Sequence, residues 1–528
     1  MGLEKKKLGV VLSLMMILVT VYFFNKQTVT SSEPLIIGRA VDSESLDPAR
    51  VTDAESFKVS VNIYENLLKI SENGKIEPCL ASSWDVSEDE KTWTFQLKKN
   101  IKFQDGEPFN AESVVFNFER WKDEENPYHR GTFHYWDNNF KGTGHTIISV
   151  KAVSEYGLEI ELNKPYAPFL SVLATPAFGI ASPEAIKKYK DIYDEHPVGT
   201  GAYELKKWDK GERIILQKNK NYWGQIAAID EIEFRVISDK NKRIEALRKG
   251  KIHIAEQLTS DDIEKMSGSP DISIYRRPFM NIGYLALNNG AEPLNSSKVR
   301  KAISYAIDNE TLVGQVYNSQ EREANSFLPP VMFAFNGKLE HNPKDIQKAK
   351  SLLDEANFDF AQTISLSVMS KPRGYMPKPI ETAEYIKKAL GEIGIKVEIR
   401  VYNWDEYLEH LRNGQHQMAI AGWNGDNFDP DNFLYTLFAS SNAHYGSAVN
   451  YAFFKNDRVD MLLENAREMT DRGFRESLYQ EIQNIVYEET ASIPLIHTMP
   501  IIGVRKEILN FKPSPAGEES LQGVKFNQ

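Results

Sequence analysis

Short segments in the first half of the chain alternate between polar and apolar residues, the pattern of a strand with one buried face. The segments with this pattern are Thr92–Leu97, Gly157–Leu162 and, less regularly, 35–41 and 213–216. Asn110 precedes an apolar stretch and suits the N-cap position, so we expect a helix over 110–118. The first half is therefore predicted to be a strand-rich α+β region.

The second half changes to strands and helices that alternate. Ile386, Leu390 and Ile393 lie at helical spacing, and Asn413-Gly414 is a helix stop signal. Strands are expected at 363–369, 397–401 and 417–421, and helices at 380–393 and 404–412. Strands that alternate with helices in this way predict βαβ units and a parallel sheet.

Two loops follow strands of this predicted sheet, and each carries a charged residue. Arg373 lies in a Pro- and Gly-containing loop after the first strand, and Asp426 follows the third strand, in the segment 422–433. Parallel strands end at one edge of a sheet, where ligands bind in open α/β folds, so we expect both residues to face one crevice.

These two side chains have the chemistry to bind the two ends of a zwitterion such as a dipeptide. A guanidinium can hold a carboxylate through two parallel hydrogen bonds, and the Asp426 carboxylate can accept from an ammonium. Residue types alone leave other interpretations open. The loop 422–433 can be a solvated turn, Arg373 an exposed surface residue and Trp423 ordinary core packing.

Length and composition narrow the functional classes. A chain of 528 residues is long enough for two to four domains or lobes. The net charge of -11 argues against a nucleic-acid partner, which needs clustered Lys and Arg. No motif for a metal, a phosphate or a catalytic nucleophile is found, so we expect no enzyme activity, no cofactor and no metal site. The single cysteine, Cys79, excludes an internal disulfide.

The N-terminus has the pattern of an export signal. Lys5, Lys6 and Lys7 precede an uncharged apolar run over 8–24, close to the shortest length that spans a bilayer. A clear cleavage site and a cysteine for lipid attachment are both missing. We therefore expect residues 1–33 to be an uncleaved anchor and tether, with the rest on the outer face of the cytoplasmic membrane. The alternative is a cleaved signal and a periplasmic or secreted protein.

Several short motifs occur in the order found in one protein family. They lie at 101–111, 126–129, 197–203, 221–224, 281–288, 298–302 and 422–433. Together they make the chain resemble, over about 34–520, the extracytoplasmic solute-binding proteins of family 5, which serve peptide and nickel ABC importers. Within that family it is most similar to the dipeptide-binding proteins.

The resemblance implies an α/β fold of two lobes, the periplasmic-binding-protein-like fold of class II, which closes on its ligand. The first lobe would comprise 34–277, with an extra subdomain at about 60–190, and the second lobe 278–499. Residues 500–528 would return to the first lobe. A monomer is the family expectation.

The resemblance also implies a function and a set of site residues. In the dipeptide-binding branch an Asp of the motif Gly-Asp-Asn-x-Asp-Pro-Asp takes the peptide ammonium, and Asp426 matches it. An Arg in the loop before a helix of the second lobe takes the carboxylate, and Arg373 matches it. The remaining expected ligand contacts are Trp423, Asn424, Gly425 and Tyr375. Short peptides, dipeptides in particular, would be captured between the lobes and delivered to a membrane permease.

Three alternatives to peptide delivery stay open. The protein could carry nickel or a metal chelate, for which His444 or His497 could serve. It could carry haem, or it could be a peptide sensor. The peptide length, the side-chain preference and the identity of the permease are not determined by these motifs.

Overall fold

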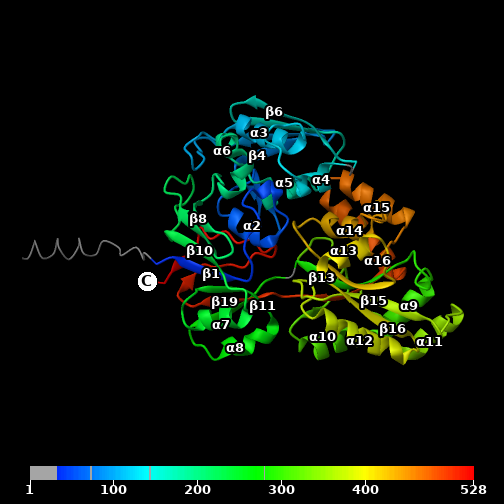
Figure 1. Cartoon of the computed structure of the whole chain (residues 1–528). Coiled ribbons are helices and arrows are strands. Elements are labelled where there is room, and N and C mark those ends of the chain that lie inside the picture. Colours follow the sequence, from blue (N-terminus) through cyan, green and yellow to red (C-terminus); the bar gives the residue numbers. More distant parts are fainter. Residues whose placement is uncertain (1–32, 72–73, 142–143, 279, 528) are drawn as a thin grey trace, which may run out of the picture.

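The computed structural model describes residues 33–71, 74–141, 144–278 and 280–527, and it has two parts, each built on its own large sheet (Figure 1). We call the part with the seven- and four-stranded sheets lobe I and the part with the six-stranded sheet lobe II. The expected anchor over 1–33 lies almost wholly outside the described residues. Among those that are described, no helix is both long and apolar enough to cross a bilayer.

The seven-stranded sheet of lobe I is assembled from both ends of the chain. Its strand order is β12-β19-β11-β1-β10-β9-β8, with β1 parallel to both neighbours and the other pairs antiparallel. The strands are β1 (Leu35–Arg39), β8 (Tyr203–Asp209), β9 (Arg213–Lys218), β10 (Glu231–Val236), β11 (Ile254–Leu258), β12 (Ile272–Arg276) and β19 (Ile501–Arg505). The small helices α2 (Ala54–Ser60), α6 (Pro183–Tyr189), α7 (Lys240–Arg248) and α8 (Ile263–Ser267) also belong to lobe I. Because β19 comes late in the chain, the C-terminal segment returns to lobe I.

A second layer of lobe I surrounds an antiparallel sheet in the order β4-β5-β7-β6, seen at the top of Figure 1. Its apolar faces and the helices α3 and α4 enclose an aromatic core that includes Phe118, Trp121 and Trp136. The elements are β2 (Leu68–Ile70), β3 (Ile76–Pro78), β4 (Ala81–Val86), β5 (Thr92–Leu97), α3 (Ala111–Lys122), α4 (His134–Phe140), β6 (Ile147–Ser154), β7 (Gly157–Leu162) and α5 (Phe169–Leu173). Asn110 caps α3 through the Ser113 amide, as predicted.

Lobe II contains the predicted parallel strands within a mixed sheet. The order is β14-β18-β13-β17-β15-β16; β15 is parallel to both β16 and β17, while β13 is antiparallel to β17 and β18. The strands are β13 (Asn281–Leu287), β14 (Arg322–Glu323), β15 (Thr363–Met369), β16 (Lys396–Tyr402), β17 (Met418–Asn424) and β18 (Ser492–His497). The helices are α9 (Ser297–Ala306), α10 (Asn309–Tyr317), α11 (Ile346–Glu355), α12 (Pro379–Glu392), α13 (Trp404–Arg412), α14 (Asp431–Phe438), α15 (Asp457–Glu468) and α16 (Arg472–Glu488).

One predicted boundary is wrong. The loop expected from Gly422 begins only after Asn424, because β17 stays paired with β13 as far as Asn281 opposite Asn424. Gly422 also permits a close approach, since a Cβ there would lie 2.1 Å from the Tyr375 ring. The strand therefore carries Gly422 and Trp423 to the edge of the sheet.

The chain passes between the lobes twice, at about 277–280 and 498–500, and the two crossings are bonded to each other. The Arg277 amide donates to the Pro500 carbonyl at 2.9 Å. The Asn281 side chain donates to the Thr498 carbonyl at 3.0 Å and accepts from its amide at 2.8 Å. The crossings thus form a narrow double connection between two separately packed cores.

Candidate functional site

The loops after β15 and β17 lie side by side at one edge of the lobe II sheet. The loop of Arg373 is a tight turn, closed by backbone hydrogen bonds in both directions between Arg373 and Met376. Thr498 fixes this turn by donating from its hydroxyl to the Gly374 carbonyl at 2.6 Å. A Cβ at Gly374 would lie 3.8 Å from the Asn424 side chain. The strand order therefore brings the two predicted loops together.

The segment 422–433 holds three aspartates, and two of them are already neutralised. Asp429 accepts two hydrogen bonds from the Arg475 guanidinium at 2.7 and 2.9 Å. Asp431 is ion-paired with Arg467 at 3.3 Å. Both pairs are buried and tie the loop to α15 and α16. Asp426 alone has no Lys or Arg partner among the described residues.

Asp426 lies in the cleft between the lobes and is held by polar groups. Its amide donates to the Asn432 side chain at 3.1 Å, and the Tyr135 hydroxyl of lobe I hydrogen-bonds to its carboxylate. Removal from water raises the pKa of Asp426 to about 6, and no Lys or Arg of the described residues compensates its negative charge. An arriving ammonium would supply that missing charge.

The Arg373 guanidinium stacks on an aromatic ring, and it has no carboxylate partner among the described residues. Its guanidinium carbon lies 3.4 Å from the centre of the Trp404 ring, a cation–π stack. Trp404 is the first residue of α13, whose N-cap is Asn403. No carboxylate within the described part of the chain pairs with Arg373, and burial lowers the pKa of its guanidinium. The stack fixes the plane of the guanidinium and leaves its N–H groups for a ligand carboxylate.

A cavity of about 260 Å³ lies between the lobes beside Asp426. Lobe I lines it with Tyr135, Asn138 and Thr175, and lobe II lines it with Asp426, Trp423 and Asn442. The lining is mainly polar, with the Asp431–Arg467 pair at one side. Of the six predicted contacts, only Asp426 and Trp423 line this cavity.

The other predicted residues shape the sheet edge. The ring of Tyr375 packs over Gly422, and its carbonyl would be 2.5 Å from a Cβ at Gly283. The Gly425 amide donates to the Met280 carbonyl at 2.7 Å, so it is not available to a ligand. Asn424 is exposed at the end of β17 beside Gly374.

Sequence reasoning missed three residues of this region. Asn432, which also accepts from the Trp423 indole at 3.1 Å, lies inside the recognised motif and could have been found there. Trp404 is the first residue of a predicted helix. Its position directly after a parallel strand indicates the sheet edge at which ligands bind. Tyr135 comes from lobe I, and only the tertiary fold brings it to the cleft.

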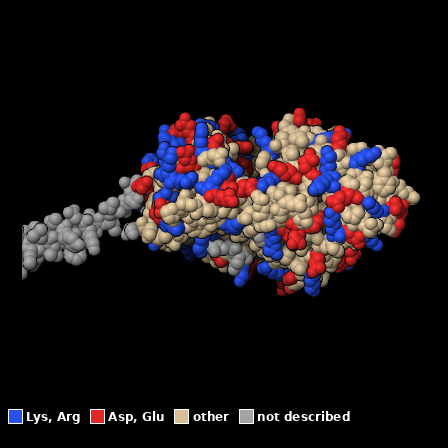
Figure 2. Space-filling model, turned by 90° about the horizontal axis from the view of Figure 1, so that it is seen from below, with Lys and Arg blue, Asp and Glu red and all other residues tan. Residues whose placement is uncertain are grey.

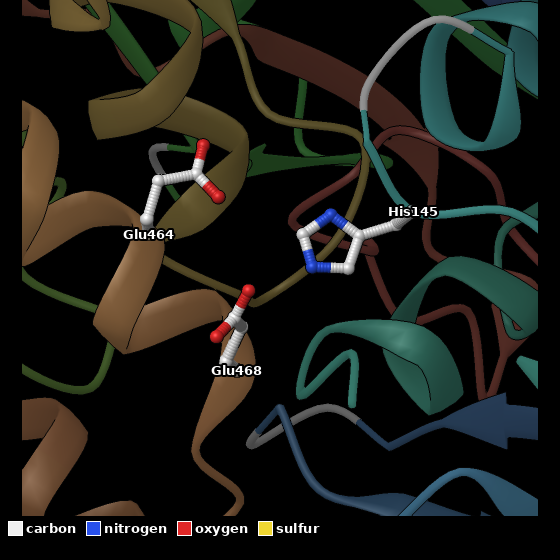
Figure 3. Close-up of side chains that lie close together, drawn as sticks. All are labelled: His145, Glu464 and Glu468. Carbon is white, nitrogen blue, oxygen red and sulfur yellow. The ribbon is translucent and has the colours of Figure 1, made fainter. Parts of the chain in front are cut away.

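The lobes also touch at the rim of the cleft, where Glu464 and Glu468 on α15 of lobe II point toward His145 of lobe I (Figure 3). Possible metal-ligand atoms of the three residues lie within 4.8 Å of one another. The Lys164 ammonium, also from lobe I, lies 2.7 Å from Glu468 and 3.6 Å from Glu464. Because the Lys164 ammonium pairs with both carboxylates, the cluster is an ionic contact between the lobes.

The surface carries both signs of charge. Seen from below in Figure 2, Lys and Arg side chains are interspersed with Asp and Glu over both lobes.

Residues 75–445 match the family model of bacterial extracellular solute-binding proteins, family 5 (middle region). The chain is 32% identical over 501 residues to the dipeptide-binding protein of Escherichia coli (strain K12), across 91% of this chain and 92% of that protein. It is 31% identical to heme-binding protein A of Haemophilus influenzae, across 90% and 89% of the two chains.

The fold is similar to that of a solved relative. It matches the ABC transporter-associated periplasmic binding protein DppA from Helicobacter pylori in complex with peptide STSA. The TM-score is 0.81 with 31% identity, over 94% of this chain and 98% of that chain. The expected two-lobed α/β fold is thereby confirmed, and the protein is of a solute-binding class and not an enzyme class. The chain belongs to the bacterial extracellular solute-binding proteins of family 5.

Proposed function

We propose that this protein is the extracytoplasmic substrate-binding component of an ABC importer and that it captures dipeptides between its lobes. One observation carries the proposal. At one sheet edge, the described residues leave a carboxylate without a cation, Asp426, and a guanidinium without a carboxylate, Arg373. A dipeptide supplies both missing charges. Relatives named as dipeptide-binding proteins support the same ligand class.

Binding relies on charge-assisted hydrogen bonds formed away from water. The peptide ammonium donates to Asp426, and the peptide carboxylate accepts from Arg373 in its fixed plane on Trp404. Such bonds are shorter and stronger than neutral ones, and they gain further when closure removes solvent. The polar cavity beside Asp426 would take a side chain together with water, which permits varied peptide sequences.

Closure is a hinge motion of the two lobes about the bonded crossings near 277–280 and 498–500. The boundaries 34–277, 278–499 and 500–528 are our proposal for the parts that move together. The closed form, with contacts such as Lys164 to Glu468 across the rim, would be the form that a membrane permease accepts. We further propose a monomer held at the outer face of the membrane by residues 1–33.

The chelate and haem alternatives have weaker support in the described structure. His497 is buried, and its Nδ1 hydrogen-bonds with the Asn281 carbonyl at 2.6 Å; burial lowers the pKa of this imidazole to about 4. His444 is exposed and does not line the cavity. Haem stays the second candidate because heme-binding protein A is a relative of similar identity.

A comparison of ligand classes tests the proposal. The full-length protein is titrated with dialanine, nickel–histidine and haemin in separate calorimetric experiments. Saturable binding of dialanine at a 1:1 ratio, with no binding of the other two, is the expected result. Binding of haemin or of nickel–histidine without binding of dialanine would overturn the proposal and assign the site to that ligand.

A further inference from the structure

We infer that helices α4 and α14 form a subsite for the side chain of the first peptide residue, and that this subsite favours a neutral side chain that both donates and accepts hydrogen bonds, such as that of glutamine. This inference rests on the proposed function. It names the class of dipeptide that the site would bind most tightly.

The cavity of about 260 Å³ lies at the ammonium end of the proposed site. Asp426 belongs to its lining, whereas Arg373 and the Trp404 ring on which it stacks do not. The ammonium and the first side chain of a peptide are attached to the same Cα atom, so an ammonium bound to Asp426 brings the first side chain next to this cavity. One water molecule needs only about 10–15 Å³ of such space. The cavity therefore has room for a long side chain.

Two helices, one from each lobe, line this cavity (Figure 1). On α4 of lobe I, Tyr135 and Asn138 are three positions apart and so lie on one face of the helix. On α14 of lobe II, Asn432 is followed at three and four positions by Tyr435 and Thr436, which share a face in the same way. The lobes thus bring two polar helix faces together around the space for the side chain.

Several polar groups of the lining have no hydrogen-bond partner among the described residues. They are the Thr436 hydroxyl, the Asn138 side-chain amide, Nδ2 of the buried Asn427 and Oδ1 of Asn442. The other polar atom of each of the last two is bonded: Asn427 Oδ1 accepts from the Asp429 amide at 2.9 Å, and Asn442 Nδ2 donates to the Tyr435 carbonyl at 2.9 Å. These bonds fix the orientation of both amides. The cavity therefore offers free donors and free acceptors together.

The charges around the cavity favour a side chain without a charge. Asp431 and Arg467 both line the cavity, and they are paired with each other at 3.3 Å. Asp426 is the remaining charged residue of the lining, and the ligand ammonium would balance it. A charge on the side chain would then have no partner, and burying an unpaired charge is costly.

A hydrogen-bonding side chain satisfies groups that an apolar side chain leaves unpaired. Buried polar groups without a partner lose free energy, so a site of this kind discriminates against ligands that lack the matching group. A carboxamide has one acceptor oxygen and two N–H donors, and it can bond to both kinds of free group. Water can fill the remaining space, so apolar side chains still bind, but less tightly.

Calorimetric titration of the full-length protein with glutaminyl-alanine (Gln-Ala) and methionyl-alanine (Met-Ala) tests the inference, because the two first side chains are similar in length and differ in hydrogen bonding. Gln-Ala should bind about tenfold more tightly, which corresponds to one or two neutral hydrogen bonds. An apolar subsite would give the opposite order, since burial of the methionine side chain is favourable. The reversed dipeptides, Ala-Gln and Ala-Met, are the positional control and should differ much less from each other. Glu-Ala, which has nearly the shape of Gln-Ala but an added charge, should bind more weakly than Gln-Ala.

Two substitutions test whether the helix faces are responsible. Thr436→Val and Asn138→Ala each remove a free polar group from one helix, and each should lower the ratio of the Gln-Ala affinity to the Met-Ala affinity about threefold. The matched control is Thr363→Val, at the exposed first residue of β15, which should keep the ratio. Because the result is a ratio, a general loss of folding or closure lowers both affinities and leaves the ratio unchanged.

The outcomes separate this inference from the proposed function. If the unmodified protein binds none of these dipeptides, the proposed function fails and this inference fails with it. If it binds them, and Met-Ala binds at least as tightly as Gln-Ala, only the subsite preference is overturned. An unchanged ratio in both Thr436→Val and Asn138→Ala would overturn the assignment of the subsite to α14 and α4.

Discussion

The two faces of the cleft are built in different ways. The lobe II face comes from two short loops at one sheet edge, and each offers a charge that no described residue neutralises, Asp426 and Arg373. The lobe I face comes from segments far apart in the sequence, and the charges of lobe I near the crossings, among them Lys58 and Arg277, are paired with carboxylates of the same lobe. Lobe II would therefore supply most of the ligand affinity, while lobe I completes the site on closure.

Within lobe II, a similar contrast exists inside one loop. Asp429 and Asp431 are fixed by arginines from α16 and α15, and Asp426 is not. The two paired aspartates stabilise the conformation of the loop, and the unpaired Asp426 carboxylate is available to bind a ligand cation. The predictions below separate these roles, from the largest expected effect to the smallest.

Arg475→Met should have the largest effect of the five substitutions, and the property that it changes is the stability of the protein. It leaves the buried Asp429 carboxylate without its partner, which typically costs about 3–5 kcal/mol of unfolding free energy. Denaturant unfolding of the ligand-free protein measures this. An unchanged midpoint would show that the pair does not support the loop.

Asp426→Asn should abolish most dipeptide binding with little loss of stability. Removing one partner of a buried charge pair typically lowers affinity about 100-fold or more. Calorimetry with dialanine measures the loss, and an unchanged melting temperature shows that the fold is intact. Retained affinity would mean that Asp426 does not hold the ammonium.

Arg373→Lys should weaken dialanine binding by about tenfold, because a lysine keeps the charge but loses the planar fork that binds a carboxylate through two bonds. The stack on Trp404 would be lost as well. Dialanine amide has no carboxylate, so the loss of the two carboxylate bonds cannot lower its affinity. Any loss of affinity for the amide in the variant therefore reports the missing stack on Trp404. Equal affinity of the variant and the unmodified protein for dialanine would contradict the assigned role.

Tyr135→Phe should weaken binding less, by up to about tenfold, because it removes only the hydroxyl that supports the Asp426 carboxylate. The ring contact with Phe57, at 5.5 Å between centroids, is kept. Titration with dialanine gives the change in affinity. A loss as large as that of Asp426→Asn would show that lobe I contributes as much as lobe II.

Lys164→Met should have the smallest effect. The contact with Glu468 lies at the rim, where an ion pair contributes at most about 1 kcal/mol and is screened by salt. The matched control is Lys187→Met, whose pair with Glu184 lies within lobe I. Affinity for dialanine should fall slightly at low salt for Lys164→Met and remain unchanged for the control.

Much of lobe II could be predicted from the sequence, because its strands and helices alternate with regular apolar spacing. The predicted bounds of β15 and α13 match the structure, and the position of both loops at one edge follows from the parallel pairing. The continuation of β17 through Gly422 could not be predicted, since it depends on pairing with β13 and on the Tyr375 ring.

The lobe I side of the site has no comparable local signal. Tyr135 lies on a short helix in an aromatic subdomain. Which charges stay free in this lobe depends on which are already paired, and pairs such as Arg277 with Glu519 join residues more than 200 positions apart. Sequence patterns report local structure, and they do not report this distribution of charge.

The most direct test of the central claim is calorimetric titration of the full-length protein with dialanine, N-acetyl-dialanine and dialanine amide. If Asp426 and Arg373 bind the two peptide termini, dialanine binds and each blocked form loses most of the affinity. N-acetyl-dialanine, which has no ammonium, should bind to Asp426→Asn and to the unmodified protein with the same affinity. Equal binding of all three peptides would contradict the account, because no terminal charge would then be recognised.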